Sequence, residues 1–236
     1  MKSKTLILII IILVYLNFLG ADESIEKFKR EIGNELSNKL EKTFIALKEA
    51  ERKGIATEML LNKVREGIAK GVSSEKIYVV ILDRISKIEV SLKIVNELKK
   101  KGIRYKNENN IIEEITFSLE LGVSPSILEK ILLNAYNRVK NVGFFYEVVR
   151  YINYLWINNV TEKKYFDVFD IAVKGGLSGI ELKNIVNYII DIKRKDADIT
   201  KLKKDVQDAV KRKQDFIEKE IKIQEKLEME EDKRRE

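Results

Sequence analysis

The sequence predicts an all-α protein that contains a repeated pair of helices, and three observations support this fold class. The chain of 236 residues has one proline and eleven glycines, which favours long helices over strands and turns. Its apolar residues recur at spacings of three and four, as on one face of a helix, rather than at the spacing of two typical of strands. A pattern of apolar residues around a glycine also occurs three times along the chain.

From these observations we predict three copies of a helical hairpin of about 50 residues each, because internal repetition at such a period is typical of stacked helical arrays. An N-terminal helix would cap this array, and a long charged helix would follow it. The predicted domains are a targeting segment over 1–21, a repeat domain over 22–196 and a charged helical tail over 197–236.

The N-terminus has the pattern of a targeting segment. Lys2 and Lys4 precede a largely apolar stretch over 6–19, and small residues at 20–21 precede a polar stretch. Fourteen helical residues reach roughly 21 Å, whereas a bilayer core is about 30 Å thick. This length favours a signal peptide. Leu19 suits cleavage after Ala21 poorly, so an uncleaved anchor over 5–21 remains the alternative. Both readings place the rest of the chain in the periplasm or outside the cell.

The first predicted helix covers 24–53, where apolar residues recur on one face. The residues that form this face are Ile25, Phe28, Ile32, Leu36, Leu40, Phe44 and Leu47.

The repeat is anchored on Gly71, Gly122 and Gly176, which are 51 and 54 residues apart. Apolar residues stand ten, seven and three positions before each glycine and one and six positions after it. A serine stands two positions after it. These residues are Leu61, Val64, Ile68, Val72, Ser73 and Ile77 in the first copy, Ile112, Ile115, Leu119, Val123, Ser124 and Leu128 in the second, and Phe166, Phe169, Val173, Leu177, Ser178 and Leu182 in the third.

The Gly-apolar-Ser triplet predicts the end of one helix and the start of the next. Glycine readily takes the left-handed conformation that ends a helix, and serine accepts a hydrogen bond from a free N–H of the following helix. Pro125 follows Ser124 at the first helical position. Glu181 lies three residues after Ser178, as in a capping box. The six glycines and serines are therefore our predicted structural corners.

A second corner is predicted upstream in each copy, at Gly54-Ile55, Gly102-Ile103 and Asn159-Val160. Glycine and asparagine tolerate the left-handed conformation best. Thr57 and Thr161 are candidate caps for the helices that follow. The resulting predicted helices cover 58–70, 109–121 and 163–175 (short) and 74–100, 124–158 with a break near 142, and 179–195 (long).

The tail is rich in both lysine and glutamate, and its apolar residues form an interrupted seam at helical spacing. The seam comprises Ile199, Leu202, Val206, Ala209, Phe216, Ile223 and Leu227. Alternating charges at helical spacing predict an extended, charge-stabilised helix. Pairing with a partner helix in a short coiled coil is the alternative.

The composition restricts the chemistry. Without cysteine or histidine, the chain lacks thiol nucleophiles, thiolate zinc sites and Ser-His-Asp catalysis, and we predict no cofactor and no metal. Asp167 and Asp170 lie one helical turn apart and would suit acid–base work, but we interpret them as a solvated helix face. Glu113 and Glu114 are neighbours, which point apart on a helix.

Six aromatic residues fall within 144–156. Phe144, Tyr151, Tyr154 and Trp156 are the candidate interaction patch. The alternative is a core helix, because positions 145, 149, 152 and 156 share one helix face.

The formal charge is +7, with both signs interleaved along the chain. A nucleic-acid binder gathers its basic residues on one face, so we predict no nucleic-acid partner. We expect a non-enzymatic, exported scaffold or interaction module at the cell envelope that binds a protein or peptide. The alternatives are a protein that associates with the membrane surface through its N-terminus, and an envelope hydrolase that uses carboxylates.

Overall fold

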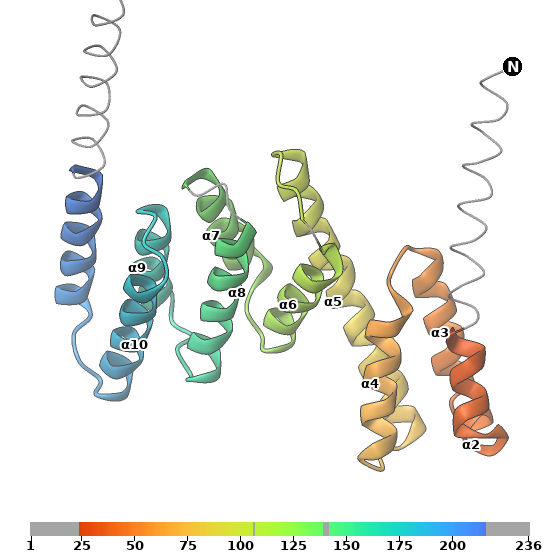
Figure 1. The fold of residues 1–236 in the computed structure, drawn as a ribbon. Coiled ribbons are helices and arrows are strands. Elements are labelled where there is room, and N and C mark those ends of the chain that lie inside the picture. The colour runs from red at the N-terminus through yellow and green to blue at the C-terminus, as the bar shows by residue number, and fades with distance from the viewer. Residues whose placement is uncertain (1–23, 106, 139–141, 216–236) are drawn as a thin grey trace, which may run out of the picture. The chain divides into compact units, whose positions relative to one another are not determined.

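The computed structural model describes residues 24–105, 107–138 and 142–215 (Figure 1). All the regular elements in this part of the chain are helices, which confirms the all-α prediction. The chain forms two compact units, unit 1 over 1–93 and unit 2 over 94–236, with the boundary inside one long helix. The predicted signal peptide or anchor lies outside the described residues.

The helices agree with the predicted bounds to within one residue from 57 onward. Those of unit 1 are 24–32, α2 Asn34–Lys39, α3 Glu41–Arg52, α4 Thr57–Ala69 and α5 Ser74–Lys100, which runs on into unit 2. Those of unit 2 are α6 Glu108–Glu120, α7 Pro125–Arg138, α8 Val142–Ile157, α9 Lys163–Lys174, α10 Ile180–Arg194 and a last helix described over 200–215.

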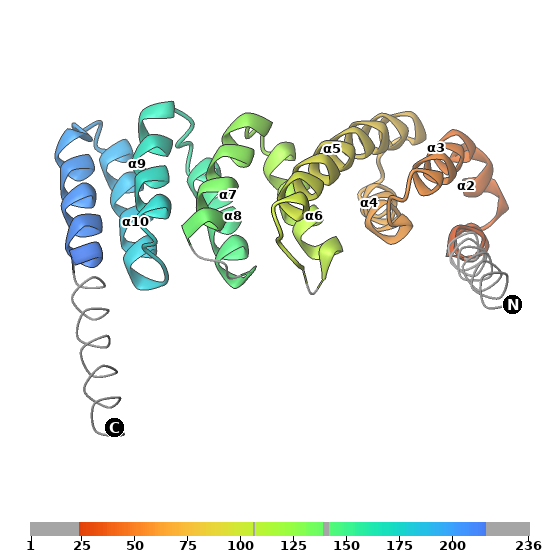
Figure 2. The ribbon, with the colours of Figure 1, turned by 90° about the horizontal axis from the view of Figure 1, so that it is seen from above.

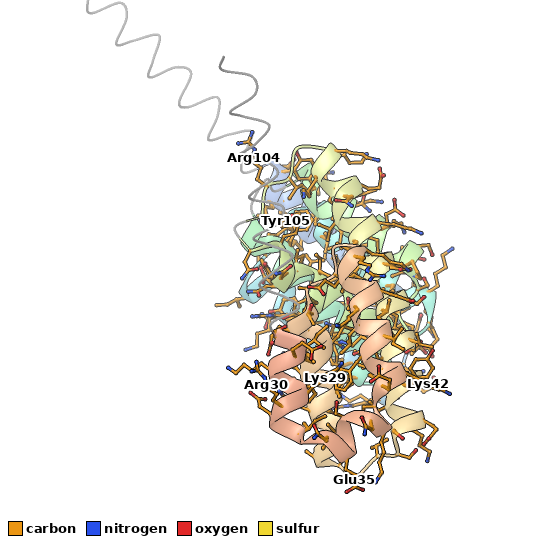
Figure 3. The ribbon with its side chains drawn as sticks, turned by 90° about the vertical axis from the view of Figure 1, so that its right-hand side faces the viewer. Lys29, Arg30, Glu35, Lys42, Arg104 and Tyr105 are labelled. Atoms are coloured by element: carbon orange, nitrogen blue, oxygen red, sulfur yellow. The ribbon has the colours of Figure 1, made fainter. Side chains whose placement is uncertain are left out.

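The single N-terminal helix predicted over 24–53 is wrong. Gly33, with φ +80°, interrupts it, and α2 ends at Leu40. The helix over 24–32 therefore folds back on α3, with the Phe28 and Phe44 rings edge to face at 6.2 Å. Lys29 lies between these helices (Figure 3), with its ammonium 5.0 Å from the centre of the Phe44 ring. The break was not predicted because the helices on both sides of Gly33 each bury an apolar face, so the apolar residues keep helical spacing across it.

Gly71, Gly122 and Gly176 each end a helix, with φ of +65°, +98° and +73°. At each one the following N–H reaches back five residues, as in a Schellman motif. The Val123 N–H, for example, donates to the Ser118 carbonyl at 3.0 Å. The same hydrogen bond closes four further corners, at Gly54, Gly102, Asn159 and Asp196, all with positive φ.

The serines behave differently at the three corners. Ser73 and Ser124 accept hydrogen bonds from backbone N–H groups three residues ahead, at 3.5 and 3.3 Å. Ser178 does not cap a helix, because the chain makes one more turn and α10 has Gly179 as its N-cap. The Gly179 N–H donates instead to the Glu147 carboxylate of α8, at 2.7 Å.

The other predicted caps are also wrong. Ala56 and Glu162, not Thr57 and Thr161, occupy the N-cap positions of α4 and α9. Glu181 forms no capping box and pairs with Lys213 of the last helix at 2.7 Å. Sequence spacing alone does not reveal these long-range partners.

Within unit 2, each helix packs in parallel beside the second helix along the chain: α6 against α8, α7 against α9, and α8 against α10 (Figures 1 and 2). Hydrogen bonds between these helices join residues 35 or 36 apart. They are Ser118–Asn153 at 2.6 Å, Asn134–Asp170 at 2.6 Å and Asn158–Arg194 at 3.0 Å. In unit 1, Lys53 and Glu89 are likewise 36 residues apart and form an ion pair at 2.7 Å.

This register differs from the 51- and 54-residue spacings of the three glycines, and the three predicted copies are not equivalent. Two helices, α5 and α6, separate Gly71 from Gly122, whereas three helices separate Gly122 from Gly176. The Gly71–Gly122 and Gly122–Gly176 spacings are similar only because α5 has 27 residues, about twice the length of the helices in unit 2.

The last helix is packed onto unit 2 over its described residues. Ile199, Leu202 and Val206 of the predicted seam are buried. A Cβ atom at Gly175 would lie only 2.2 Å from Val210, so α9 and the last helix approach closely there. Phe216, Ile223 and Leu227, and with them the question of a coiled coil, lie outside the described residues.

Replacing Gly122 by valine should lower the free energy of unfolding by about 1–2 kcal/mol, because a β-branched residue is strained at φ +98°. Asn159→Gly at the equivalent corner is the control and should leave stability within about 0.5 kcal/mol, since glycine adopts φ +59° freely. Chemical denaturation followed by circular dichroism measures both. Equal stability of the valine variant and the parent chain would contradict the assigned corner.

Candidate interaction surface

Within the described part of unit 2, the large apolar side chains that remain exposed lie on three parallel helices, α6, α8 and α10. They are Phe117, Tyr154, Ile157, Ile180 and Tyr188, with exposures of 41–76%. We call these residues the aromatic face. A set of exposed large apolar side chains on one surface commonly marks an interaction site.

The helix register accounts for this arrangement. Phe117 and Tyr154 are 37 residues apart, and so are Tyr151 and Tyr188. Because α6 packs beside α8, and α8 beside α10, with a register near 36, residues separated in this way occupy matching positions on neighbouring helices. Phe117, Ile180 and Tyr188 were not among the predicted patch residues, and the spacing of 37 is the signal that could have found Phe117 and Tyr188.

The predicted patch divides between the surface and the core. Tyr154 is exposed and Tyr151 is half-buried. Phe144, in contrast, is buried at 4% exposure, so its assignment to the patch is wrong. Trp156 is half-buried, with its ring 5.7 Å from that of Phe166. Phe145, Val149 and Ile152 are fully buried, as the alternative of a core helix predicts.

The helices that carry the N-terminal part of the aromatic face are acidic. Together α6 and α8 contain five glutamates and a single cation, Arg150, in a chain whose net charge is +7. Arg150 pairs with Glu114 at 3.4 Å. Burial, helped by the Glu147 carboxylate, raises the pKa of Tyr151. The three helices that alternate with these, α7, α9 and 200–215, carry eleven cations and six carboxylates.

A cavity of about 350 Å³ lies between α7 and α9. Its lining is mixed, with Ile127 and Phe166 next to Lys130, Lys163 and Asp167. Lys130 forms ion pairs with Asp170 at 3.0 Å and with Asp167 at 3.6 Å. The hydrogen bond to Asp170 raises the pKa of Lys130, so this lysine is held as a cation by the protein itself.

Asp170 is not part of a solvated face, and that interpretation is wrong. Its side chain is only 5% exposed, and it binds both Lys130 and Lys174. It also accepts a hydrogen bond from the Asn134 side chain at 2.6 Å. Two of these three partners, Lys130 and Asn134, come from α7. Asp170 therefore joins α7 to α9, whereas Asp167 is half-exposed.

Unit 1 has its own apolar depression, of about 380 Å³, which includes Leu36, Leu40, Ile68 and Ile77 in its lining. A smaller one next to it is edged by Lys63, Lys70 and Glu66. Hydrogen bonds from both lysines lower the pKa of Glu66 to about 2. These charges are mutually compensated at the surface.

No helix among the described residues is long and apolar enough to cross a membrane. The same residues bring no group of three or more carboxylates into a metal-binding arrangement. No family model, curated protein or solved structure matches the chain.

Replacing Asp170 by alanine should lower the free energy of unfolding by about 1–3 kcal/mol, because Asn134 and two lysines lose a buried partner. Asp167→Ala is the matched control on the same helix. Its half-exposed pairing should contribute no more than about 0.5 kcal/mol. Urea denaturation of both variants measures the difference, and equal effects would contradict the joining role of Asp170.

Proposed function

We propose that the protein is a non-enzymatic, exported helical-repeat module that binds a protein partner at the cell envelope. The observation that carries this proposal is the aromatic face, because a folded domain gains nothing by leaving Phe117, Tyr154 and Tyr188 in water. Aromatic side chains bury a large area in binding and are enriched at the centre of protein interfaces.

The proposed repeat is a helical hairpin of about 37 residues rather than 50. Its copies in unit 2 are α6–α7, α8–α9 and α10 with the helix over 200–215. The corners inside these hairpins, Gly122, Asn159 and Asp196, are spaced by 37 residues, which supports this unit. Hydrogen bonds between equivalent helices at offsets of 35–37 support it as well. Stacked hairpins place the same helix of every copy on one face, as extended binding surfaces require.

The proposed location depends on the N-terminal sequence. Lys2 and Lys4 followed by the apolar stretch over 6–19 support export. The stretch would either be removed after export or keep the protein at the membrane. In both cases the aromatic face would meet partners outside the cytoplasm. Asp167 and Asp170, which would suit acid–base work by their spacing, are paired with lysines, and this supports a structural role for them.

Site-specific photo-crosslinking in cells that produce the protein tests this proposal. A photoreactive amino acid at Tyr154 or Tyr188 should give a discrete crosslinked species in the envelope fraction, because these side chains would lie in the interface. The matched controls are Glu129 on α7 and Lys164 on α9, which are exposed on the alternating helices. Crosslinks of equal yield at all four positions, or at the control positions alone, would contradict the proposed surface.

A further inference from the structure

The charge distribution of unit 2 identifies the kind of partner that would suit the aromatic face. We infer that the α6–α8 part of this face binds a cationic segment in which lysine or arginine side chains alternate with apolar ones. This inference rests on the proposed function, since it assigns a chemistry to the partner of the same surface.

The charges of α6 and α8 complement a cationic segment. The glutamates of α6 and α8 are Glu108, Glu113, Glu114, Glu120 and Glu147, and Arg150 is the one cation on these two helices. Arg150 pairs with Glu114, and Lys99 at the end of α5 pairs with Glu108 at 2.8 Å. The exposed Glu113 and the partly exposed Glu114 lie within one helical turn of Phe117. A partner of the opposite sign would be attracted to this face and repelled by the more basic helices that alternate with it.

The exposed rings also suit cationic side chains. A ring face attracts ammonium and guanidinium groups, and a nearby carboxylate strengthens that attraction. This chain already forms such contacts internally. The Arg65 guanidinium lies 4.9 Å from the centre of the Phe28 ring, and the Lys164 ammonium lies 4.9 Å from that of Tyr165. Phe117 and Tyr154 are 41% and 45% exposed, so part of each side chain is accessible to a cation of the partner.

The aromatic face also offers apolar contacts over a length that a short peptide can span. Ile157, 57% exposed, lies three residues after Tyr154 on α8 and offers a place for an aliphatic side chain. Packed helices are about 8–10 Å apart, so a segment that crosses from α6 to α10 covers roughly 20 Å. About six residues of extended chain span that distance. A peptide of twelve residues is therefore long enough to engage the whole face.

Two fluorescein-labelled dodecapeptides test the inference with the full-length chain. One contains four repeats of Lys-Leu-Ser and the other four repeats of Glu-Leu-Ser, so the two peptides carry opposite charges at the same four positions. Fluorescence anisotropy at low ionic strength should show at least about tenfold tighter binding of the cationic peptide. High salt should reduce this preference, because exposed charges are screened.

Variants locate the binding. Glu113→Gln combined with Glu114→Gln should weaken binding of the cationic peptide at least about threefold, because two attractive charges are removed. Tyr154→Ala should weaken it by a similar factor through loss of the ring. Glu129→Gln on α7 is the matched control, and its affinity should equal that of the parent chain. Circular dichroism checks that each variant is folded.

The possible outcomes separate this inference from the proposed function. Equal binding of both peptides, weakened by Tyr154→Ala, would overturn the cationic preference but leave the interaction surface in place. Binding of the cationic peptide that no variant of the face changes would overturn the assignment to α6 and α8. Failure of the chain to bind either peptide would overturn the inference, while the crosslinking test of the surface would still stand by itself.

Discussion

Alternate helices of unit 2 pack in parallel at a register of about 36 residues, and the rest of the structure depends on this packing. It requires each helix to end abruptly and the chain to reverse within a few residues. Residues with left-handed backbone, such as Gly122 and Asn159, make those reversals. The packing also buries the polar contacts that fix the register, among them Ser118 to Asn153 at 2.6 Å. Unsatisfied polar groups are costly in a core, so a slip of one helical turn would lose these bonds together.

The proposed interaction surface follows from the same register. Parallel helices two apart in the chain share one face, so α6, α8 and α10 gather their exposed rings while α7, α9 and the last helix gather most of the positive charge. A sequence whose two signs of charge look well mixed thus places most cations of these six helices on one alternating set, while its carboxylates are divided between both sets. The close approach of Val210 to Gly175 shows that the last helix belongs to the packed body of unit 2.

Most helix bounds could be predicted because the residues that end helices act locally. Glycine followed by an apolar residue marked the corners at 71, 122 and 176 without knowledge of the fold. Properties that depend on distant partners could not be predicted. The Gly179 N–H at the start of α10 donates to Glu147 of α8, and Ser178 does not cap that helix. Asp170 is buried and pairs with two lysines, one of which, Lys130, belongs to another helix. The similar spacings of the three glycines did not reveal that two helices separate the first pair and three separate the second, because α5 alone has 27 residues. Tyr154 was found from local aromatic density, whereas Tyr188 needed the register.

The register can be measured directly in a chain without native cysteine. Cysteines introduced together at Glu114 and Arg150, whose side chains lie 3.4 Å apart, should be joined in high yield by a short bismaleimide. A pair at Glu114 and Asp167, 53 residues apart, tests the spacing suggested by the three glycines and should remain unlinked. The account predicts crosslinking of the first pair alone. Efficient crosslinking of the second pair, with none of the first, would contradict it.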